Sequence, residues 1–229
     1  MSKDYKTSIV ILCYNRFDLT NTLLAGLVLH EKDGIDEILV VDNGSRPEAS
    51  VGLATWDGFK TFPITILRLD SNVGFVRGFN AGLSAVCGTE RKIVFAISND
   101  VKIHGKFIHQ AEEILLKRQR YLVGNRHIAF DSGWNVFNNT THDYLEGYFL
   151  ACTSDGWIDL GFFDERFAPM DYEDIDISTT AKSKGYKLVS LNNPNIVHIG
   201  AGTYGYTEER RKQTEKNREV FKKKWILNI

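Results

Sequence analysis

Apolar runs and amphipathic segments alternate through about the first 120 residues of the chain. Four runs have the pattern of buried strands: TSIVILCY (7–14), EILVV (37–41), ITILRLD (64–70) and KIVFAIS (92–98). The segments 17–30 and 71–88 have the apolar spacing of helices, and Asp18 or Thr20 is the expected N-cap of the first. Alternating strands and helices predict βαβ units. The expected fold is therefore α/β, with a mostly parallel, doubly wound central sheet and helices on both faces.

The second half of the chain has a less regular pattern. Residues 121–160 mix glycine, asparagine, threonine and aromatic residues, with one strand expected within 146–154. A last strand is predicted at 195–199, and the charged tail from Thr207 is predicted to be helical. Because no linker-like segment or internal repeat interrupts the pattern, we expect a single domain.

Polar residues follow each of the four predicted strands. The clusters are Tyr14-Asn15, Asp42-Asn43, Asp70-Ser71-Asn72 and Asn99-Asp100. The carboxyl ends of parallel strands lie along one edge of a sheet, which is where open α/β sheets bind ligands, so these side chains should converge. A simple turn is the competing interpretation, because Asn and Asp also favour turns.

Composition narrows the class of protein. The 229 residues carry a formal net charge of −1, which gives no electrostatic reason to expect nucleic acid as a partner. No apolar run approaches the roughly 18 to 20 residues of a membrane span, and the first residues lack the apolar core of a secretory signal. The three cysteines, Cys13, Cys87 and Cys152, form no disulfide or zinc pattern. We therefore expect a cytoplasmic protein with reduced cysteines.

Two strand-end carboxylates are candidates for binding a nucleotide. Asp42 would accept a hydrogen bond from a nucleobase N–H or a ribose hydroxyl, and Asp100 would bind a divalent cation that bridges a diphosphate. His198 lies among apolar residues in the last predicted strand, where it is either a core histidine or a further metal ligand.

The segment NVGFVRGFN (72–80) has the pattern of a phosphate-binding loop that enters a helix. Its glycines would let the backbone approach a ligand, and the first N–H groups of the helix would be available to phosphate. The candidate residues are Asn72, Gly74, Arg77, Gly78 and Asn80. A tight loop in which glycine serves packing is the alternative.

The run DYEDID places Asp171, Glu173, Asp174 and Asp176 within six residues. Like charges at this density raise some pKa values, which suits a general base. The alternative is a solvated helix N-terminus, where acidic residues favour the helix dipole. The later segment GAGTYG (200–205) matches G-x-G-x-x-G, but no further βαβ unit follows it, so we do not predict a dinucleotide fold.

In combination and order, these motifs resemble the GT-A glycosyltransferases of family 2, especially the rhamnosyltransferase-like branch. The resemblance runs from Ser8 to about Trp225. Its motifs are SIVILCYNR, VVDNGS, NVGFVRGFN, ISNDV, the segment 147–189 with its E-D-x-D helix start, and VHIGAGT. One departure is Ser98-Asn99-Asp100, where many GT-A enzymes carry Asp-x-Asp, and this leaves a single carboxylate for a metal.

The resemblance implies one GT-A domain over residues 1–229, with a nucleotide-sugar-binding half to about residue 120, an acceptor and catalytic half over about 121–206, and a C-terminal helix over 207–229. Asp174 is the expected catalytic base, and Glu173, the second catalytic residue, is expected to orient the acceptor or cap the helix. Asp100 and His198 are the expected metal ligands. The implied nucleotide-sugar-binding residues are Tyr14, Asn15, Arg16, Asp42, Asn72, Gly74, Arg77, Gly78, Asn80, Ser98, Asn99 and Asp100.

The implied reaction is inverting transfer of a sugar, with rhamnose as one candidate, from a UDP- or dTDP-sugar to a hydroxyl of a glycan or lipid-linked acceptor, assisted by Mn²⁺ or Mg²⁺. Two other functions stay open: a sugar nucleotidyltransferase, although CYNRFD replaces the glycine-rich loop expected after its first strand, and a non-catalytic nucleotide-sugar-binding module. The basic end of the tail, Lys222–Trp225, would suit peripheral contact with an anionic membrane. A surface helix, or a face for a neighbouring domain, is the alternative.

Overall fold

The computed structural model describes residues 5–54, 63–88, 90–117, 120–130, 142–200, 205 and 207–225. The helices are α1 (Phe17–Glu31), α2 (Pro47–Ala54), α3 (Gly74–Val86), α4 (Ile108–Leu115), α5 (Ser154–Leu160), the 3₁₀ helix η2 (Glu165–Phe167), α6 (Glu173–Ser183) and α7 (Glu208–Trp225). The strands are β1 (Lys6–Cys13), β2 (Glu37–Asp42), β3 (Ile64–Arg68), β4 (Lys92–Ser98), β5 (Val101–Ile103), β6 (Tyr121–Gly124), β7 (His127–Phe130), β8 (His142–Leu145), β9 (Phe149–Thr153), β10 (Lys187–Ser190) and β11 (Ile196–His198).

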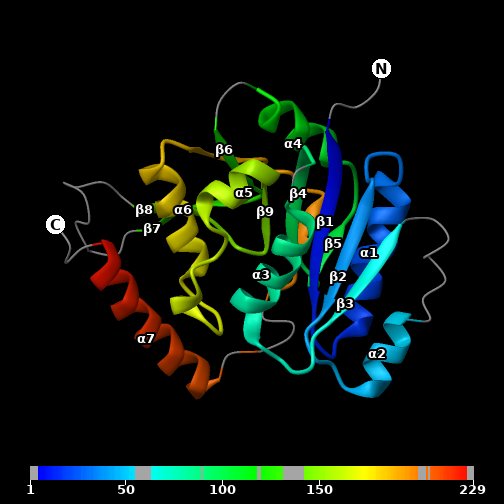
Figure 1. Ribbon diagram of the computed structural model, residues 1–229, viewed down its shortest axis with the longest axis horizontal. Helices are drawn as coiled ribbons and strands as arrows, with labels where there is room; N and C mark the ends of the chain where they lie inside the picture. The colour runs from blue at the N-terminus through cyan, green and yellow to red at the C-terminus, as the bar shows by residue number, and fades with distance from the viewer. Residues whose placement is uncertain are drawn as a thin grey trace.

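A seven-stranded sheet in the order β10-β6-β9-β4-β1-β2-β3 forms the centre of the fold (Figure 1). Neighbouring strands from β4 to β3 are parallel, as are β10 and β6, whereas β9 runs antiparallel to both β4 and β6. Two smaller sheets pair β11 with β5 and β7 with β8, both antiparallel. The predicted α/β fold with a mostly parallel central sheet is confirmed.

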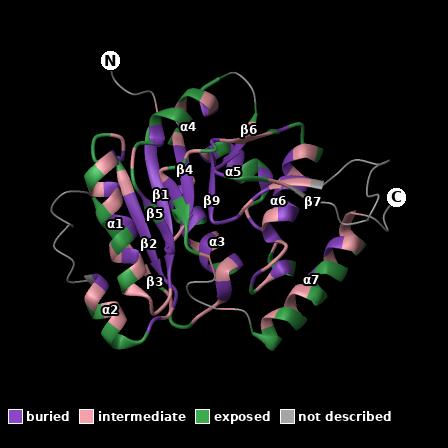
Figure 2. Cartoon of the chain, turned by 180° about the vertical axis from the view of Figure 1, so that it is seen from behind, coloured by how far each residue is buried: buried purple, intermediate pink, exposed green. Residues whose placement is uncertain are grey.

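Both faces of the central sheet are covered by helices. Along β1, Ile9 and Ile11 pack into a core that includes α1 and α4, whereas Val10 and Leu12 pack into a second core that includes α3, α5 and α6. This alternation follows from the two-residue period of a strand. Figure 2 shows that the central strands are buried along almost their whole length, and most of their buried residues are apolar.

Some local expectations were wrong. The N-cap of α1 is Arg16, and its side chain makes no capping bond, so Asp18 lies in the first turn and Thr20 further inside the helix. Several short elements, including α2, α5 and β10, were not predicted. They have too few residues for a periodic pattern to appear. The predicted helices at α3 and α7 and the strands at β9 and β11 are confirmed.

Helix α7 is anchored to the segment that precedes α6. Asn217 is fully buried, and its amide nitrogen lies 2.7 Å from the carbonyl oxygen of Phe167 and 2.8 Å from those of Met170 and Asp171. Near the other end of α7, Lys224 Nζ lies 2.8 Å from a carboxylate oxygen of Asp176.

Two of the four residues considered for membrane contact, Lys224 and Trp225, bind acidic residues within the protein. Lys224 also pairs with Asp164 at 2.8 Å, and the indole of Trp225 donates to Asp176 at 2.7 Å. Among the described residues, no helix combines the length and the apolar character needed to cross a bilayer.

We predict that Asn217→Ala lowers the free energy of unfolding by about 1 to 3 kcal/mol, because it leaves buried carbonyl oxygens without a donor. Chemical denaturation measures the change. Lys216→Ala, at the exposed neighbouring position of the same helix, is the control and should change the midpoint little. An unchanged midpoint in Asn217→Ala would show that the amide does not hold this segment.

Candidate active site

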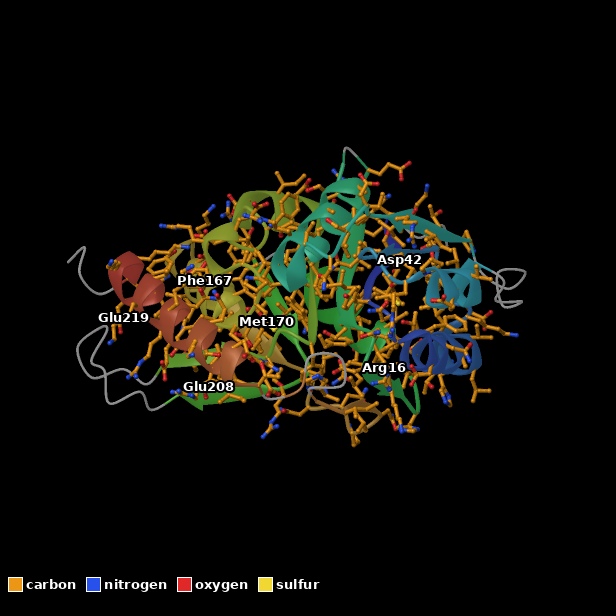
Figure 3. The ribbon with its side chains drawn as sticks, turned by 90° about the horizontal axis from the view of Figure 1, so that it is seen from below. Arg16, Asp42, Phe167, Met170, Glu208 and Glu219 are labelled. Atoms are coloured by element: carbon orange, nitrogen blue, oxygen red, sulfur yellow. The ribbon has the colours of Figure 1, made fainter. Side chains whose placement is uncertain are left out.

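A pocket of about 360 Å³ lies at the carboxyl ends of β1 and β4. The chain connections run in opposite directions on either side of these two strands, so the pocket lies at the topological switch point, where doubly wound sheets bind ligands. Seven residues predicted from the sequence line it: Tyr14, Ser98, Asn99, Asp100, Glu173, Asp174 and His198. Figure 3 views the molecule from the side on which these strands end, with Met170, another lining residue, between α7 and the sheet.

Asp100 and His198 come together although they are almost 100 residues apart in the sequence. Pairing of β5 with β11 sets His198 opposite Val101, and His198 Nε2 lies 3.3 Å from Asp100 Oδ1. The imidazole also stacks on the ring of Tyr148, with ring centroids 4.3 Å apart and planes 15° apart. Within the described ranges, no third His, Cys, Asp or Glu completes a metal-binding group with this pair.

The donor types nevertheless fit a cation shared with a substrate. Magnesium and similar hard ions commonly use one or two protein carboxylates together with substrate phosphates. Asp100 supplies the carboxylate, and His198 supplies a nitrogen that suits manganese. Five carboxylates line the pocket: Asp100, Glu146, Asp171, Glu173 and Asp174. A diphosphate entering so acidic a pocket needs added positive charge.

Helix α6 begins at the predicted pair of acidic residues, immediately after a turn with unusual backbone geometry. Asp171 and Tyr172 have φ values of 73° and 72°, in the left-handed region. For residues other than glycine this conformation costs roughly 1 to 2 kcal/mol each. The turn places Glu173 and Asp174 in the first turn of α6, with both side chains at the pocket.

Burial controls the charge of both carboxylates. It raises the pKa of Asp174 to about 6, against partial compensation by the amide of Gly147, which donates to Oδ2 at 3.2 Å. Burial and then the neighbouring Asp174 charge raise the pKa of Glu173 well above its usual value. Glu173 Oε2 is buried and has no hydrogen-bond partner in the described structure. Asp174 therefore has the pKa of a base that works near neutral pH, whereas Glu173 holds its proton to higher pH.

The loop at 72–80 differs from the phosphate cradle expected from the sequence. The amides of Val73, Gly74 and Val76 already donate to Asn43, Asn72 and Pro169, at 3.0, 2.9 and 3.1 Å. A Cβ on Gly74 would lie 2.6 Å from Pro169 Cβ, so glycine here permits close packing. The expected free N–H groups are therefore not found at Val73, Gly74 and Val76: two are bonded by asparagine side chains, and that of Val76 is bonded by the segment before α6.

The other candidates in this loop make structural contacts. A Cβ on Gly78 would lie 2.5 Å from Leu12 Cδ1, which indicates close packing of α3 on β1. Asn80 binds the backbone of Phe163 through both ends of its amide, at 2.8 and 3.0 Å. Arg77 pairs with Glu165 at 3.1 Å on an exposed surface.

The residues after β1 and β2 are joined to one another. Asn15 accepts from the amide of Arg46 at 2.7 Å, and Arg16 pairs with Asp18 at 2.7 Å on the surface. Asp42 is 1 % exposed and accepts from the Ser45 amide, the Ser50 hydroxyl and Arg68. Burial opposes ionisation of Asp42, but these bonds outweigh it and lower its pKa. The carboxylate organises the loop after β2, and a base-binding role for it stays a prediction.

Several lining residues were not predicted as site residues: Asn43, Tyr144, Glu146, Tyr148, Arg210 and Thr214. Tyr148 lies in the strand-like segment 146–154, where an aromatic residue gives no sign of stacking on a distant histidine. Arg210 is one of many basic residues in the tail, and the sequence gives no reason to single it out.

The chain was compared with known families and structures. The sequence model described as "Glycosyl transferase family 2" matches residues 8–182. The chain therefore belongs to glycosyl transferase family 2, and its class is that of the glycosyltransferases. No curated protein matches it significantly in sequence.

Solved structures share its fold. GalNAc-T7 with UDP, GalNAc and Mn²⁺ has 12% identity and a TM-score of 0.68, over 83% of this chain and 43% of that one. The mannosyltransferase PcManGT from Pyrobaculum calidifontis, in complex with GDP-Man and Mn²⁺, has 15% identity and a TM-score of 0.70, over 96% and 65%. S. aureus TarS 1–349 with UDP-GlcNAc has 15% identity and a TM-score of 0.64, over 91% and 64%. The chain thus spans 43% to 65% of the length of these structures, and its fold is that of GT-A glycosyltransferases.

The unpartnered carboxyl of Glu173 predicts a pH-dependent stability. Its pKa is raised on folding, so the native state holds this proton at pH values at which the unfolded state has lost it, and stability falls as pH rises above about 4.5. Glu173→Gln has no proton to lose, so this decrease in stability is absent from the variant. Its unfolding midpoint should therefore exceed that of the wild type at pH 8, and the difference should shrink towards pH 4. Thermal denaturation at both pH values measures this.

Glu209→Gln, an exposed acid in the first turn of α7, is the control and should change the midpoint little at either pH. A Glu173→Gln midpoint that follows the wild type at both pH values would mean that the carboxyl is hydrated or paired.

Proposed function

We propose that the chain is an inverting glycosyltransferase that moves a sugar from a nucleoside diphosphate to a hydroxyl of a glycan or lipid-linked acceptor. The observation that carries this proposal is that one pocket at the sheet's switch point is lined both by Asp100 with His198 and by the pair Glu173 and Asp174. The first pair fits a diphosphate with its cation, and the second fits removal of the acceptor's proton. Membership of glycosyl transferase family 2 supports the same reaction.

In this mechanism, the acceptor oxygen forms a bond to the anomeric carbon while the bond from that carbon to the diphosphate oxygen breaks. Attack from the face opposite the leaving group inverts the configuration, and Asp174 takes the proton from the acceptor hydroxyl. Its raised pKa of about 6 matches this role near neutral pH. The two backbone amides bonded to its carboxylate, those of Gly147 and Ile175, hold it in one orientation.

Asp100 and His198 would hold the divalent cation, Mn²⁺ or Mg²⁺. When bound, such an ion neutralises charge that develops on the departing diphosphate. The structures of GalNAc-T7 and PcManGT, both with Mn²⁺, support a cation here. The resemblance to the rhamnosyltransferase-like branch makes dTDP-rhamnose the first donor to test. The UDP-GlcNAc and GDP-Man complexes of TarS and PcManGT add UDP- and GDP-sugars to the panel.

We predict that Asp174→Asn reduces turnover about 10²- to 10⁴-fold, the usual effect of removing a positioned general base, while donor affinity changes little. Wild-type turnover should increase as pH rises through about 6, because the base must be ionised. Transfer assays over pH 5 to 8 and calorimetry with the donor test both statements. Asp155→Asn, an exposed acid in the first turn of α5, is the matched control.

Two outcomes would change this assignment. Near-normal turnover in Asp174→Asn together with an inactive Glu173→Gln would move the base by one residue. Normal turnover in both variants would exclude the mechanism.

We predict that Asp100→Asn abolishes the part of the donor affinity that depends on Mn²⁺, and that His198→Gln reduces it. Calorimetry of UDP and dTDP binding with Mn²⁺ and with chelator measures this part directly. His104→Gln, an exposed histidine beyond β5, is the control. If chelator leaves wild-type donor affinity and transfer unchanged, Asp100 and His198 are not metal ligands.

A further inference from the structure

Helix α7 contributes to the active-site pocket although it lies outside the segment matched by the family. The family match ends at residue 182, whereas α7 spans Glu208–Trp225. Two of its residues, Arg210 and Thr214, line the pocket. They lie one helical turn apart, so both side chains point to the same side of the helix.

Both residues hold the carboxylate of Asp171. The Arg210 guanidinium donates through Nη2 to Oδ1 at 2.8 Å and through Nε to Oδ2 at 3.2 Å, a bidentate pair. The Thr214 hydroxyl lies 2.7 Å from the same Oδ2. The side chains of Arg210 and Asp171 are 28% and 16% exposed, so water screens this pair less than it screens the surface pairs of α7.

Asp171 is the first of the two left-handed residues that lead into α6. Its backbone is held as well as its side chain, because its carbonyl oxygen accepts from Asn217 at 2.8 Å. Glu173 and Asp174 follow this turn directly, so any change in its geometry rotates both carboxylates relative to the pocket. A displacement of about 1 Å at a reacting group can reduce a rate about a hundredfold.

We propose that Arg210 is a positioning residue for the catalytic base: its bidentate bond to Asp171 fixes the turn that directs Asp174, and its charge offsets that of Asp171 beside the two buried carboxyls. This inference rests on the proposed function insofar as Asp174 is the base.

The charge effect has a definite sign. Among the described residues, Asp174 interacts with Glu173, Asp171, Tyr172 and the amide of Ile175 on its own segment, and with Tyr144 and the amide of Gly147 from the β8–β9 region. Arg210 pairs with Asp171. After burial, the charge of Asp171 favours the protonated forms of Glu173 and Asp174, whereas Arg210 opposes protonation of Glu173. Removing Arg210 should move the ascending limb of the pH–rate profile to higher pH, and removing the charge of Asp171 should move it to lower pH.

The test compares Arg210→Met with Arg211→Met. Arg211 pairs with Glu208 and Glu215 on the exposed side of the same helix, so its variant controls for loss of one α7 arginine. We expect Arg210→Met to lower kcat about 10- to 100-fold with donor Kd unchanged, and to shift the limb to higher pH. Arg210→Lys should recover part of the loss, and adding Asp171→Asn to Arg210→Met should move the limb back. Arg211→Met should behave as the wild type.

Two results would overturn the proposal: a folded Arg210→Met with wild-type kcat and pH profile, or a fall in donor affinity as large as the fall in turnover, which would make Arg210 a donor-binding residue. If Arg210→Met does not fold, Arg210→Lys keeps the charge but loses the bidentate bond to Asp171, and a wild-type kcat in that variant would overturn the positioning role.

A readout independent of transfer separates this inference from the proposed function. Titration of the side-chain carboxyl ¹³C signals by NMR gives the pKa of Asp174 in the wild type and in Arg210→Met. If the wild type transfers no sugar but the pKa of Asp174 rises in the variant, the proposed function fails and the inferred coupling stands. If transfer occurs and neither the pKa nor kcat changes, the inference alone fails.

Discussion

The left-handed turn at Asp171 and Tyr172 is the constraint on which the geometry of this site depends. Two successive residues other than glycine adopt a costly backbone conformation. Contacts from α7 compensate for this cost: the buried amide of Asn217 donates to the carbonyl oxygens of Met170 and Asp171, and Arg210 binds the carboxylate of Asp171. The direction of α6, and of the carboxylates at its start, therefore depends on a helix that follows it by about 25 residues.

The same turn region also determines what the donor can contact. Pro169 lies against Gly74 and accepts the amide of Val76, so the start of α3 is closed by protein instead of by phosphate. In the proposed function, a cation held by Asp100 and His198 would supply positive charge for the diphosphate, and Arg210 is a further positive group that lines the pocket.

The sequence predicted the longer helices and strands, and also the site residues whose position follows directly from a strand end. Long apolar strands gave the sheet, and the parallel topology then placed Tyr14 and Asp100 at one edge, because that placement follows from strand direction alone. The sequence alone could not predict three contacts: Asn43 and Asn72 bind each other, Tyr148 stacks on His198, and Arg210 lines the pocket. Each of these contacts joins segments at least 29 residues apart, and each depends on packing that no local pattern encodes.

Glu173 and Asp174 show how this packing differentiates two adjacent carboxyls. Both are buried, yet Asp174 receives the amides of Gly147 and Ile175, whereas Glu173 Oε2 has no donor among the described residues. Hydrogen bonds to the ionised form stabilise it, so Asp174 loses its proton first and its charge then raises the pKa of Glu173 further. Near neutral pH an ionised Asp174 therefore lies beside a protonated Glu173. This difference between the two carboxyls is what the proposed role of Asp174 as the base requires, and it accompanies the stability lost in burying Glu173 Oε2 without a donor.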